Sequence, residues 1–357
     1  MSQTVNVGIV GFGYAATTFH APLIASVPGL RLKAIASSNA SKVQSAWPDV
    51  PVCDSPESLF ARPDIDLIVL PTPNDTHYPL AAQALAAGKH VVVDKPFTLT
   101  AAEARDLLAR ADAAGRLLSV FHNRRWDADF LTIQRLLSSA ALGRLTHVES
   151  HFDRYRPQVR VRWRESDAPG SGLWYDLGAH LIDQALVLFG MPRTIALDLA
   201  QQRDGALTDD WFHAVLRYDR LRVVLHASAL VADLGPRFIL HGTQGSYTKF
   251  GLDTQEEALK AGLPPVGEQW GYDPVPGTLS VAALGDQNGQ NGQIEMVHRT
   301  YENARGDYTR YYAGIRDAIV RGAPNPVPAS DALQVMRLIE LGMASFADSR
   351  VMSLDQH

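Results

Sequence analysis

The sequence predicts an α/β protein with two domains, in which a doubly wound parallel sheet is followed by an α+β domain with an antiparallel sheet. Three observations support this fold class. Short apolar segments alternate with helical patterns in the first third of the chain, a glycine-rich turn follows the first apolar segment, and from about Arg144 long segments alternate apolar with polar residues. The 357 residues, 46% of them hydrophobic, suffice for two domains of ordinary size.

Strand–helix alternation defines the first domain, which we expect to span residues 1–122. Its apolar segments alternate little, as is typical of strands covered on both faces. The expected strands are Val5–Val10, Leu30–Ala36, Asp66–Leu70, His90–Val93 and Leu117–Phe121. The expected helices are Ala15–Val27, Thr76–Gly88 and Ala101–Gly115.

The second domain, expected over residues 123–357, contains segments that suit an antiparallel sheet with one buried and one open face. These segments are Leu145–Phe152, Thr194–Ala200, Phe212–Tyr218, Val223–Ala229 and Arg237–Gly242. Residues 251–295 are rich in Gly, Pro, Asn and Gln, which predicts a long loop or lid. Two helices are expected near 308–321 and 330–347.

Composition excludes several classes of function. The net charge of −5 gives no support for nucleic-acid or anionic-membrane binding, which favours clustered basic residues. The single cysteine, Cys53, excludes an internal disulfide framework and any CxxC metal site. No apolar run has the length of a membrane span, and the N-terminal residues lack the pattern of a signal peptide. We therefore expect a cytoplasmic protein with neither a nucleic-acid nor a membrane partner.

The glycine-rich turn predicts a dinucleotide site. It places G-x-G-x-x-A directly after the first strand and before a helix, the context in which this pattern is specific. Gly11 permits the tight turn, Gly13 lets the backbone approach a pyrophosphate, and Ala16 allows close packing of helix and strand. The expected contacts in this turn are Gly11, Phe12, Gly13, Tyr14 and Ala15.

Cofactor choice is expected at the end of the second strand, where an acidic residue would bind the ribose of NAD. Here no carboxylate occurs, and the hydroxyls, amide and ammonium group present are compatible with a 2′-phosphate. These groups belong to Ser37, Ser38, Asn39 and Lys42. NADP is therefore favoured, with NAD as the alternative because no arginine is present. Ser38 or Asn39 could equally cap the next helix.

A second loop, PTPNDTH, follows the "DLIVL" strand at the carboxyl end, where ligands bind in such sheets. From it we expect cofactor contacts by Pro71, Thr72, Asn74 and His77. The alternative is that Asp75 or Thr76 caps the following helix, and one loop can serve both purposes.

Lys95 ends another strand, in Asp94-Lys95-Pro96. A lysine at a buried strand end is costly to desolvate unless it is paired or used, and Pro96 restricts it to an extended backbone. Lys95 is therefore a candidate to donate to a substrate oxygen. The alternative is a surface lysine paired with Asp94.

The segment "YDLGAHLID" predicts a helix with one polar stripe, formed by Asp176, His180, Asp183, Gln184 and Val187. An apolar stripe lies beside it, so we expect the polar stripe to face a cleft. Asp176 could fix the tautomer of His180, whose other nitrogen could then take a proton.

Aromatic and multi-donor side chains at the domain crossover and beyond it suit a polyhydroxylated substrate. They include His122, Asn123, Arg124, Trp126, Arg156, Trp163 and Tyr175. For each residue, a structural role in an interdomain salt-bridge and packing cluster is an equal alternative. No metal site is expected, because no HExxH, CxxC or His-rich run occurs.

The chain resembles the Gfo/Idh/MocA oxidoreductases over nearly its whole length, in "GIVGFGYAA", "PTPNDTH", "DKPFTLT", "HNRRWDADF", "RYRP", "RWRE" and "YDLGAHLIDQ". The resemblance implies an N-terminal Rossmann domain and a second domain with a large open antiparallel sheet that forms homodimers or tetramers. Within the family, the chain is most similar to NADP-dependent scyllo-inositol 2-dehydrogenases. This resemblance implies catalysis by Lys95, Asp176 and His180. The family usually has Glu-Lys-Pro, so Asp94 keeps the carboxylate on a shorter arm.

The implied activity is hydride transfer between NADP and a secondary alcohol of a cyclic polyol or sugar. The expected cofactor contacts then include Asp94, Lys95 and Asn123. The expected substrate contacts are Lys95, His122, Arg124, Trp126, Arg156, Trp163, Tyr175, Asp176 and His180. Two alternatives stay open: the same chemistry on an aldose or another sugar, and a non-catalytic NADP-sensing regulator.

Overall fold

The computed structural model describes residues 4–283 and 295–354. The chain divides into two compact units, each built from three segments. The first unit comprises Met1–Trp126, Thr254–Trp270 and Asp307–Arg337, and the second comprises Asp127–Asp253, Gly271–Gly306 and Leu338–His357. The expected boundary after residue 122 divides the chain once, whereas two later segments complete the first unit.

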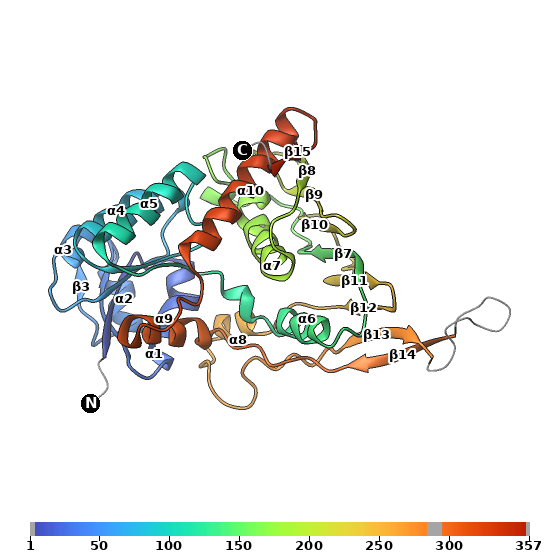
Figure 1. Cartoon of the computed structure of the whole chain (residues 1–357). Coiled ribbons are helices and arrows are strands. Elements are labelled where there is room, and N and C mark those ends of the chain that lie inside the picture. Colours follow the sequence, from blue (N-terminus) through green and yellow to red (C-terminus); the bar gives the residue numbers. More distant parts are fainter. Residues whose placement is uncertain (1–3, 284–294, 355–357) are drawn as a thin grey trace. The chain divides into compact units, whose positions relative to one another are not determined.

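The first unit contains a six-stranded parallel sheet in the order β3-β2-β1-β4-β5-β6, drawn in blue shades in Figure 1. Its strands are β1 (Val5–Val10), β2 (Leu30–Ala36), β3 (Val52–Cys53), β4 (Leu67–Leu70), β5 (His90–Val93) and β6 (Leu118–Val120). The predicted doubly wound sheet is confirmed, and only the two-residue β3 had no counterpart among the predicted strands. The order reverses between β1 and β4, so the carboxyl ends of these strands flank the crevice where such sheets bind ligands.

All three helices predicted for the first domain are present. The first is divided into a π-helical turn η1 (Ala16–His20) and α1 (Ala21–Ser26), and the others are α4 (Asn74–Ala86) and α5 (Ala101–Ala114). A capping box of Thr100 and Glu103 starts α5, and Gly115 in the left-handed conformation ends it. The further helices of this unit are α2 (Ala40–Ala46), α3 (Pro56–Phe60), η2 (Asn123–Trp126), α8 (Gln255–Lys260) and α9 (Thr309–Arg321).

The second unit contains a nine-stranded sheet in the order β14-β13-β12-β11-β7-β10-β9-β8-β15. In chain order the strands are β7 (Leu145–His151), β8 (Thr194–Ala200), β9 (Trp211–Arg217), β10 (Arg222–Ser228), β11 (Phe238–Gly242), β12 (Gly245–Lys249), β13 (Gly277–Ala282), β14 (Met296–Tyr301) and β15 (Met352–Ser353). Every pair is antiparallel except β7 with β10, which is parallel. The predicted antiparallel sheet is therefore mixed, although mostly antiparallel.

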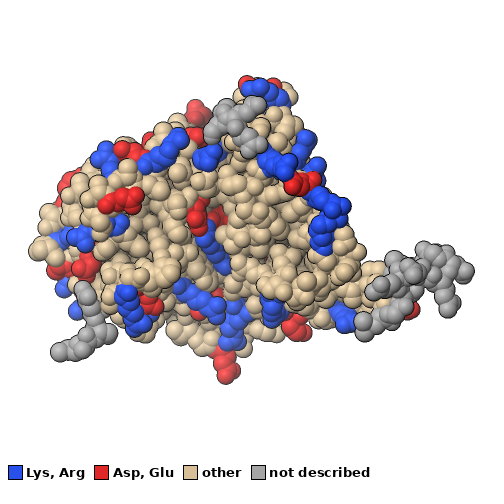
Figure 2. Space-filling view, viewed as in Figure 1, with Lys and Arg blue, Asp and Glu red and all other residues tan. Residues whose placement is uncertain are grey.

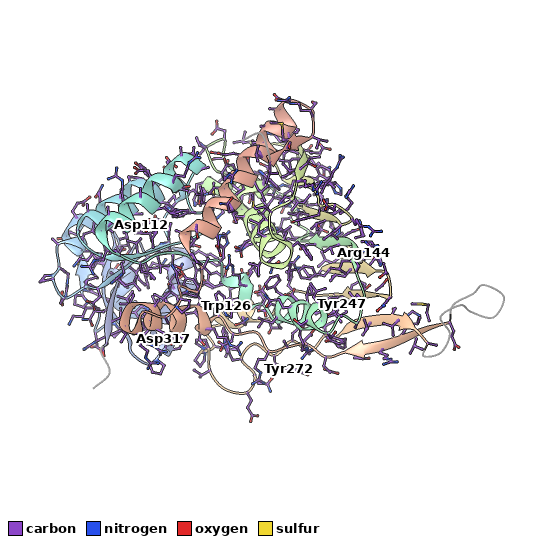
Figure 3. All side chains as sticks on the ribbon, in the orientation of Figure 1. Asp112, Trp126, Arg144, Tyr247, Tyr272 and Asp317 are labelled. Carbon is purple, nitrogen blue, oxygen red and sulfur yellow. The ribbon has the colours of Figure 1, made fainter. Side chains whose placement is uncertain are left out.

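Helices cover one face of this sheet, where Figure 1 shows α6 (Ala128–Ser138) and α7 (Ala179–Phe189) beside the strands. Tyr247 of β12 is fully buried and lies next to α6 in Figure 3. The short turns η3 (Trp163–Glu165) and η4 (Trp174–Gly178) precede α7, and α10 (Ala329–Ala347) contains the boundary between the units at Arg337. No helix of residues 4–283 and 295–354 is long and apolar enough to cross a membrane.

The prediction of a single long loop over 251–295 is wrong for the residues that are described. Helix α8 and strand β13 both lie within it, and residues 284–294 are outside the described part. The sequence QEEALK of α8 combines good helix formers with acidic residues in the first turn, and TLSV within β13 suits a strand. Averaging composition over a window of this length concealed both short elements.

Candidate active site

The turn after β1 has the backbone that a dinucleotide site requires. Gly11 has a φ of +84°, a region that favours glycine, and its N–H donates to Ala36 O at 2.7 Å. A Cβ added at Gly13 would meet no described atom within 4 Å, so the backbone there is open to a ligand. Ala16 is fully buried at the start of the following helix. The turn therefore has both the conformation and the space predicted for it.

Tyr14, at the end of this turn, is bonded to α8, an element that was not predicted. The Tyr14 hydroxyl donates to Glu256 Oε1 at 3.0 Å, and Arg124 Nη2 lies 2.7 Å from Glu256 Oε2. Burial opposes ionisation of Glu256, but Arg124 and Lys260 outweigh it and hold the pKa at about 2. Burial and this carboxylate raise the pKa of Tyr14 to about 12. Helix α8 is therefore linked to the turn after β1 by the Glu256 carboxylate, which accepts from Tyr14 and pairs with Arg124.

The end of β2 carries the groups predicted to select the cofactor. Asn39 caps α2, because its Oδ1 accepts from Lys42 N at 3.0 Å, and its own N–H donates to Ser37 Oγ at 3.1 Å. The capping alternative is thus confirmed for Asn39, while Ser38 is exposed. Lys42 Nζ donates to Phe12 O at 2.9 Å and lies 5.6 Å from the centre of the Phe12 ring. The ammonium group of Lys42 is consequently fixed against the turn.

His77, predicted to contact the cofactor, is fully buried. Its Nε2 lies 2.9 Å from Thr72 O and its Nδ1 lies 2.9 Å from Pro96 O, so the ring joins the loops after β4 and β5. Burial lowers the pKa of His77. These contacts show that His77 holds the two loops together. Asn74, from the same loop, is also buried.

Helix α4 begins without a side-chain cap. Its first residue is Asn74, and Pro73 occupies the N-cap position, so neither Asp75 nor Thr76 caps the helix as the alternative proposed. The Thr76 hydroxyl instead lies 2.7 Å from both Thr72 Oγ1 and Pro73 O, so it donates to the carbonyl and can accept from the Thr72 hydroxyl. Thr72 and Pro71 remain partly exposed at the carboxyl end of β4, as expected for the loop.

At the end of β5, Asp94 is the centre of a buried chain of polar groups. Its Oδ1 accepts from the Lys95 backbone N–H at 2.7 Å, and its Oδ2 lies 3.6 Å from His20 Nε2. His20 Nδ1 in turn lies 2.6 Å from the Tyr312 hydroxyl of α9. Burial disfavours the charged carboxylate, but His20, Lys95 and His77 hold its pKa at about 2. Asp94 therefore stays ionised beside Lys95, which is itself partly exposed.

The crossover residues after β6 are mostly buried, and several have structural partners within the first unit. His122, Asn123 and Arg124 are at most 8% exposed. Arg125 Nη2 lies 3.2 Å from Asp331 Oδ2, and Trp126, at the end of η2 in Figure 3, packs edge-on against Tyr311. Arg124 pairs with Glu256, so Arg124 and Trp126 have structural partners within the first unit, and their predicted contacts with substrate stay predictions.

In the second unit, a π-helical turn places Asp176 directly before α7. Trp174 starts this turn, is fully buried, and donates its indole N–H to Ile339 O at 3.1 Å. A Cβ at Gly178 would lie 2.7 Å from the Trp174 ring, so glycine is needed for this packing. Single π-turns are frequent at functional sites, because they rotate the following helix.

The polar stripe of this helix contains both partly exposed and buried side chains. Asp176 is partly exposed and lies 3.5 Å from Arg164 Nε, while His180, one turn later, is 5% exposed. Gln184 is buried and accepts from Arg237 Nη2 at 3.1 Å. The prediction that the whole stripe faces a cleft is therefore wrong at Gln184, because the helix turns this side chain toward the sheet.

Asp176 lines a small arginine-rich cavity within the second unit. Its walls include Arg154, Arg156, Arg162, Arg164, Arg203, Glu165 and Asp209. Glu165 holds Arg203 at 3.0 Å and Arg162 at 2.6 Å. Burial and the neighbouring Arg160 and Arg162 lower the pKa of Arg156. The cavity brings guanidinium groups and carboxylates together, but its volume of about 20 Å³ has room for about one water molecule. Tyr175 and Trp163 are partly exposed in adjoining turns.

Sequence reasoning missed several groups that the fold supplies from a distance. Asp209 Oδ2 accepts from Trp174 N at 2.7 Å and so fixes the start of the π-turn. Burial raises the pKa of Asp209 to about 6. No motif marks Asp209, His20 or Glu256. The available signals were a histidine shortly after the glycine turn for His20, and two adjacent glutamates for Glu256.

Two family models match the chain. Residues 5–122 match the "Oxidoreductase family, NAD-binding Rossmann fold" and residues 134–354 match the "Oxidoreductase family, C-terminal alpha/beta domain", both named for Gfo/Idh/MocA. An uncharacterized oxidoreductase of Escherichia coli, YdgJ, is 55% identical over 345 residues and 97% of each chain. The Bacillus subtilis scyllo-inositol 2-dehydrogenase (NADP(+)) IolW is 39% identical over 99% of this chain and 97% of its own.

The similarity extends to solved structures. A putative oxidoreductase from Yersinia pestis superposes with a TM-score of 0.93 at 53% identity and covers 99% of this chain and 98% of its own. The predicted family and fold class are confirmed. The chain belongs to the Gfo/Idh/MocA oxidoreductase family, and its relatives include an inositol dehydrogenase.

Proposed function

We propose that the protein is an NADP-dependent dehydrogenase acting on a secondary alcohol of a cyclic polyol, with scyllo-inositol and its ketone, an inosose, as the substrate pair. The observation that carries this proposal is the helical segment that carries Asp176 and His180, with Asp176 beside Arg164. It occurs in a family member aligned nearly end to end with a scyllo-inositol 2-dehydrogenase. A substrate rich in hydroxyl groups can donate to the partly exposed carboxylate of Asp176 and accept from the guanidinium group of Arg164.

The nucleotide-binding unit fits NADP in two respects. The conformation of Gly11 and the open space at Gly13 leave room for a pyrophosphate at the N-terminus of a helix. Ser37 and Ser38 offer hydroxyls, and Lys42 offers an ammonium group already fixed against the turn. When bound, the nicotinamide supplies the acceptor for the hydride.

The chain's own residues would handle the proton and the developing charge. His180 takes the hydroxyl proton of the substrate as a general base. Asp176, next to Arg164, orients His180 and stabilises its protonated form. Lys95 donates to the substrate oxygen and stabilises the negative charge that develops there. Substrate contacts by Tyr175, Trp163 and Arg156 complete the proposal.

The experiment is a measurement of reduced-nicotinamide absorbance after mixing the protein with NADP or NAD and scyllo-inositol, myo-inositol or glucose. Turnover of scyllo-inositol with NADP supports the full proposal. Turnover with NAD alone would overturn the cofactor assignment, and preferential turnover of glucose would replace the polyol with an aldose. Saturable NADP binding without turnover of any sugar or polyol in a wider panel would favour a regulatory protein that senses NADP.

We also propose that the protein is a cytoplasmic homo-oligomer, a dimer or a tetramer, formed through the open face of the nine-stranded sheet. Strand β9 alternates buried Phe212, Ala214 and Leu216 with partly exposed Trp211, His213 and Val215. Aromatic and aliphatic groups on such a face favour association. Light scattering coupled to size exclusion should give a dimer or tetramer mass, and Val215→Arg should reduce it. A monomeric wild-type protein would overturn this proposal.

A further inference from the structure

Five histidines gather on strands at the centre of the nine-stranded sheet, although they are scattered in the sequence. They are His147 and His151 of β7, His213 of β9, His226 of β10 and His241 of β11, and we call them the histidine patch. The register pairs His226 with both His151 and His213, and it pairs His241 with His147. Directly paired residues project from the same face of a sheet, so the five side chains share one face.

One carboxylate, Asp153, lies between two of these rings. Asp153 Oδ2 is 3.4 Å from His151 Nδ1, and Asp153 Oδ1 is 3.5 Å from His226 Nε2. Both distances exceed the usual 2.7–3.2 Å of a hydrogen bond. Oδ1 is buried, and among the residues that the structure describes it has no hydrogen-bond partner. The three side chains are 11–23% exposed, so a small ion can reach them.

These spacings match the ligand sphere of a metal ion. In a tetrahedral zinc site with bonds of about 2.0–2.1 Å, neighbouring ligand atoms lie about 3.3 Å apart. Candidate ligand atoms of His151, Asp153 and His226 all lie within 4.8 Å of one another. The two contacts of 3.4 Å and 3.5 Å are close to this separation, and they involve the two different oxygens of Asp153.

The surroundings of His151 provide the outer support that metal-binding histidines usually have. His151 Nε2 lies 2.8 Å from Glu149 Oε2, and an N–H donated there leaves the lone pair of Nδ1 directed toward Asp153. The other oxygen of Glu149 lies 2.7 Å from His147 Nε2, which fixes the carboxylate. His226 packs edge-on against Trp211, with ring centres 5.5 Å apart, so its orientation is also restrained.

We propose that His151, Asp153 and His226 bind a zinc ion, with Glu149 as the supporting carboxylate and a fourth position open to water or another ligand. Two imidazoles and one carboxylate favour zinc over magnesium or calcium, which prefer oxygen ligands. The ion joins β7 to β10 and stabilises the second unit. The site is separate from the groups assigned to hydride transfer. It lies on the open sheet face that we propose as the oligomer interface, because His213 of that face pairs with His226.

The test uses untagged full-length protein, depleted of metal by a chelator and titrated with zinc by calorimetry. The wild type should bind about one zinc ion per chain and unfold at a higher temperature when loaded. His226→Ala and Asp153→Asn should abolish this binding, and Glu149→Gln should weaken it about 10–100-fold. His241→Ala removes a histidine of the same patch that is not a ligand, so it should bind zinc as the wild type does.

Three results would overturn the proposal. The first is the absence of saturable zinc binding to the wild type. The second is full binding by folded His226→Ala, with folding checked by circular dichroism. The third is an equal loss of affinity in His226→Ala and His241→Ala, which would indicate diffuse binding over the whole histidine patch.

Discussion

Asp94 of the first unit is buried and Asp209 of the second unit is partly buried, yet their pKa values shift in opposite directions. The pKa of Asp94 is about 2 because the stabilisation by His20, Lys95 and His77 outweighs burial. The pKa of Asp209 is raised to about 6 because burial dominates, and its partners are backbone N–H groups and the Thr208 hydroxyl. The charge of the neighbours therefore decides the protonation of a buried carboxylate.

The two units also differ in how they bring the residues of a site together. In the parallel sheet, the cofactor groups follow strand ends, and short stretches of sequence place them together. In the second unit, Arg164, Asp176, Arg203 and Asp209 line one cavity from helical turns and loops that are separate in the sequence. Charged side chains on the surface do not mark either site, because basic and acidic groups are interspersed on the face shown in Figure 2.

The largest expected effect concerns catalysis, to which both units should contribute equally. Lys95→Ala and His180→Ala should each lower kcat by about 10²–10⁴-fold, because each removes a group that handles charge or a proton in the transition state. NADP affinity, measured by calorimetry, should persist in both variants. Near-normal turnover in Lys95→Ala would show that the first unit supplies only the nucleotide site.

The next effect separates the cofactors and should be confined to the first unit. Lys42→Ala should raise the KM for NADP about 10–100-fold with little effect on NAD, as expected for a lost contact to a charged phosphate. Lys33→Ala is the matched control, because Lys33 is a surface lysine near Asp64. Equal effects of Lys42→Ala on both cofactors would contradict a role in phosphate recognition.

Asp94 should stabilise the first unit. Its pKa is lowered from 3.8 to about 2, so its contribution is fully present above pH 4 and is lost as the pH falls through about 2. At about 1.4 kcal/mol for each pKa unit, Asp94→Asn should lower the free energy of unfolding by about 2–3 kcal/mol at pH 7. Urea denaturation at pH 7 and pH 3 measures this, and a loss that is independent of pH would contradict it.

An effect of similar size and opposite sign is expected at Asp209 in the second unit. Asp209 binds its proton more tightly in the folded state, so ionisation costs stability as the pH rises from about 4 through about 6. Asp209→Asn should therefore show less loss of stability than the wild type between pH 4.5 and pH 7.5. Parallel stability curves for the two proteins would show that Asp209 is ionised without penalty.

Much of the first unit could be predicted from sequence. Strands β1, β2 and β5 have their predicted bounds, and Gly11 and Gly13 have the predicted conformation and space. Elements with weak local signals were missed, among them the two-residue β3 and the short helix α8. Both are too short for periodicity to reveal them, and neighbouring strands and loops stabilise them.

The sequence by itself determined the features that depend on contiguous residues, namely the glycine turn after a buried strand, the lysine at a strand end and the Asp–His spacing on a helix. Only the tertiary structure decided the partners of these groups. It linked Asp94 to Tyr312 through His20, and it placed His77 within hydrogen-bond distance of the loop after β5. It also paired His151 with His226 on neighbouring strands. The physical reason is that backbone geometry is a local property, whereas the environment of a buried charge depends on residues distant in the chain.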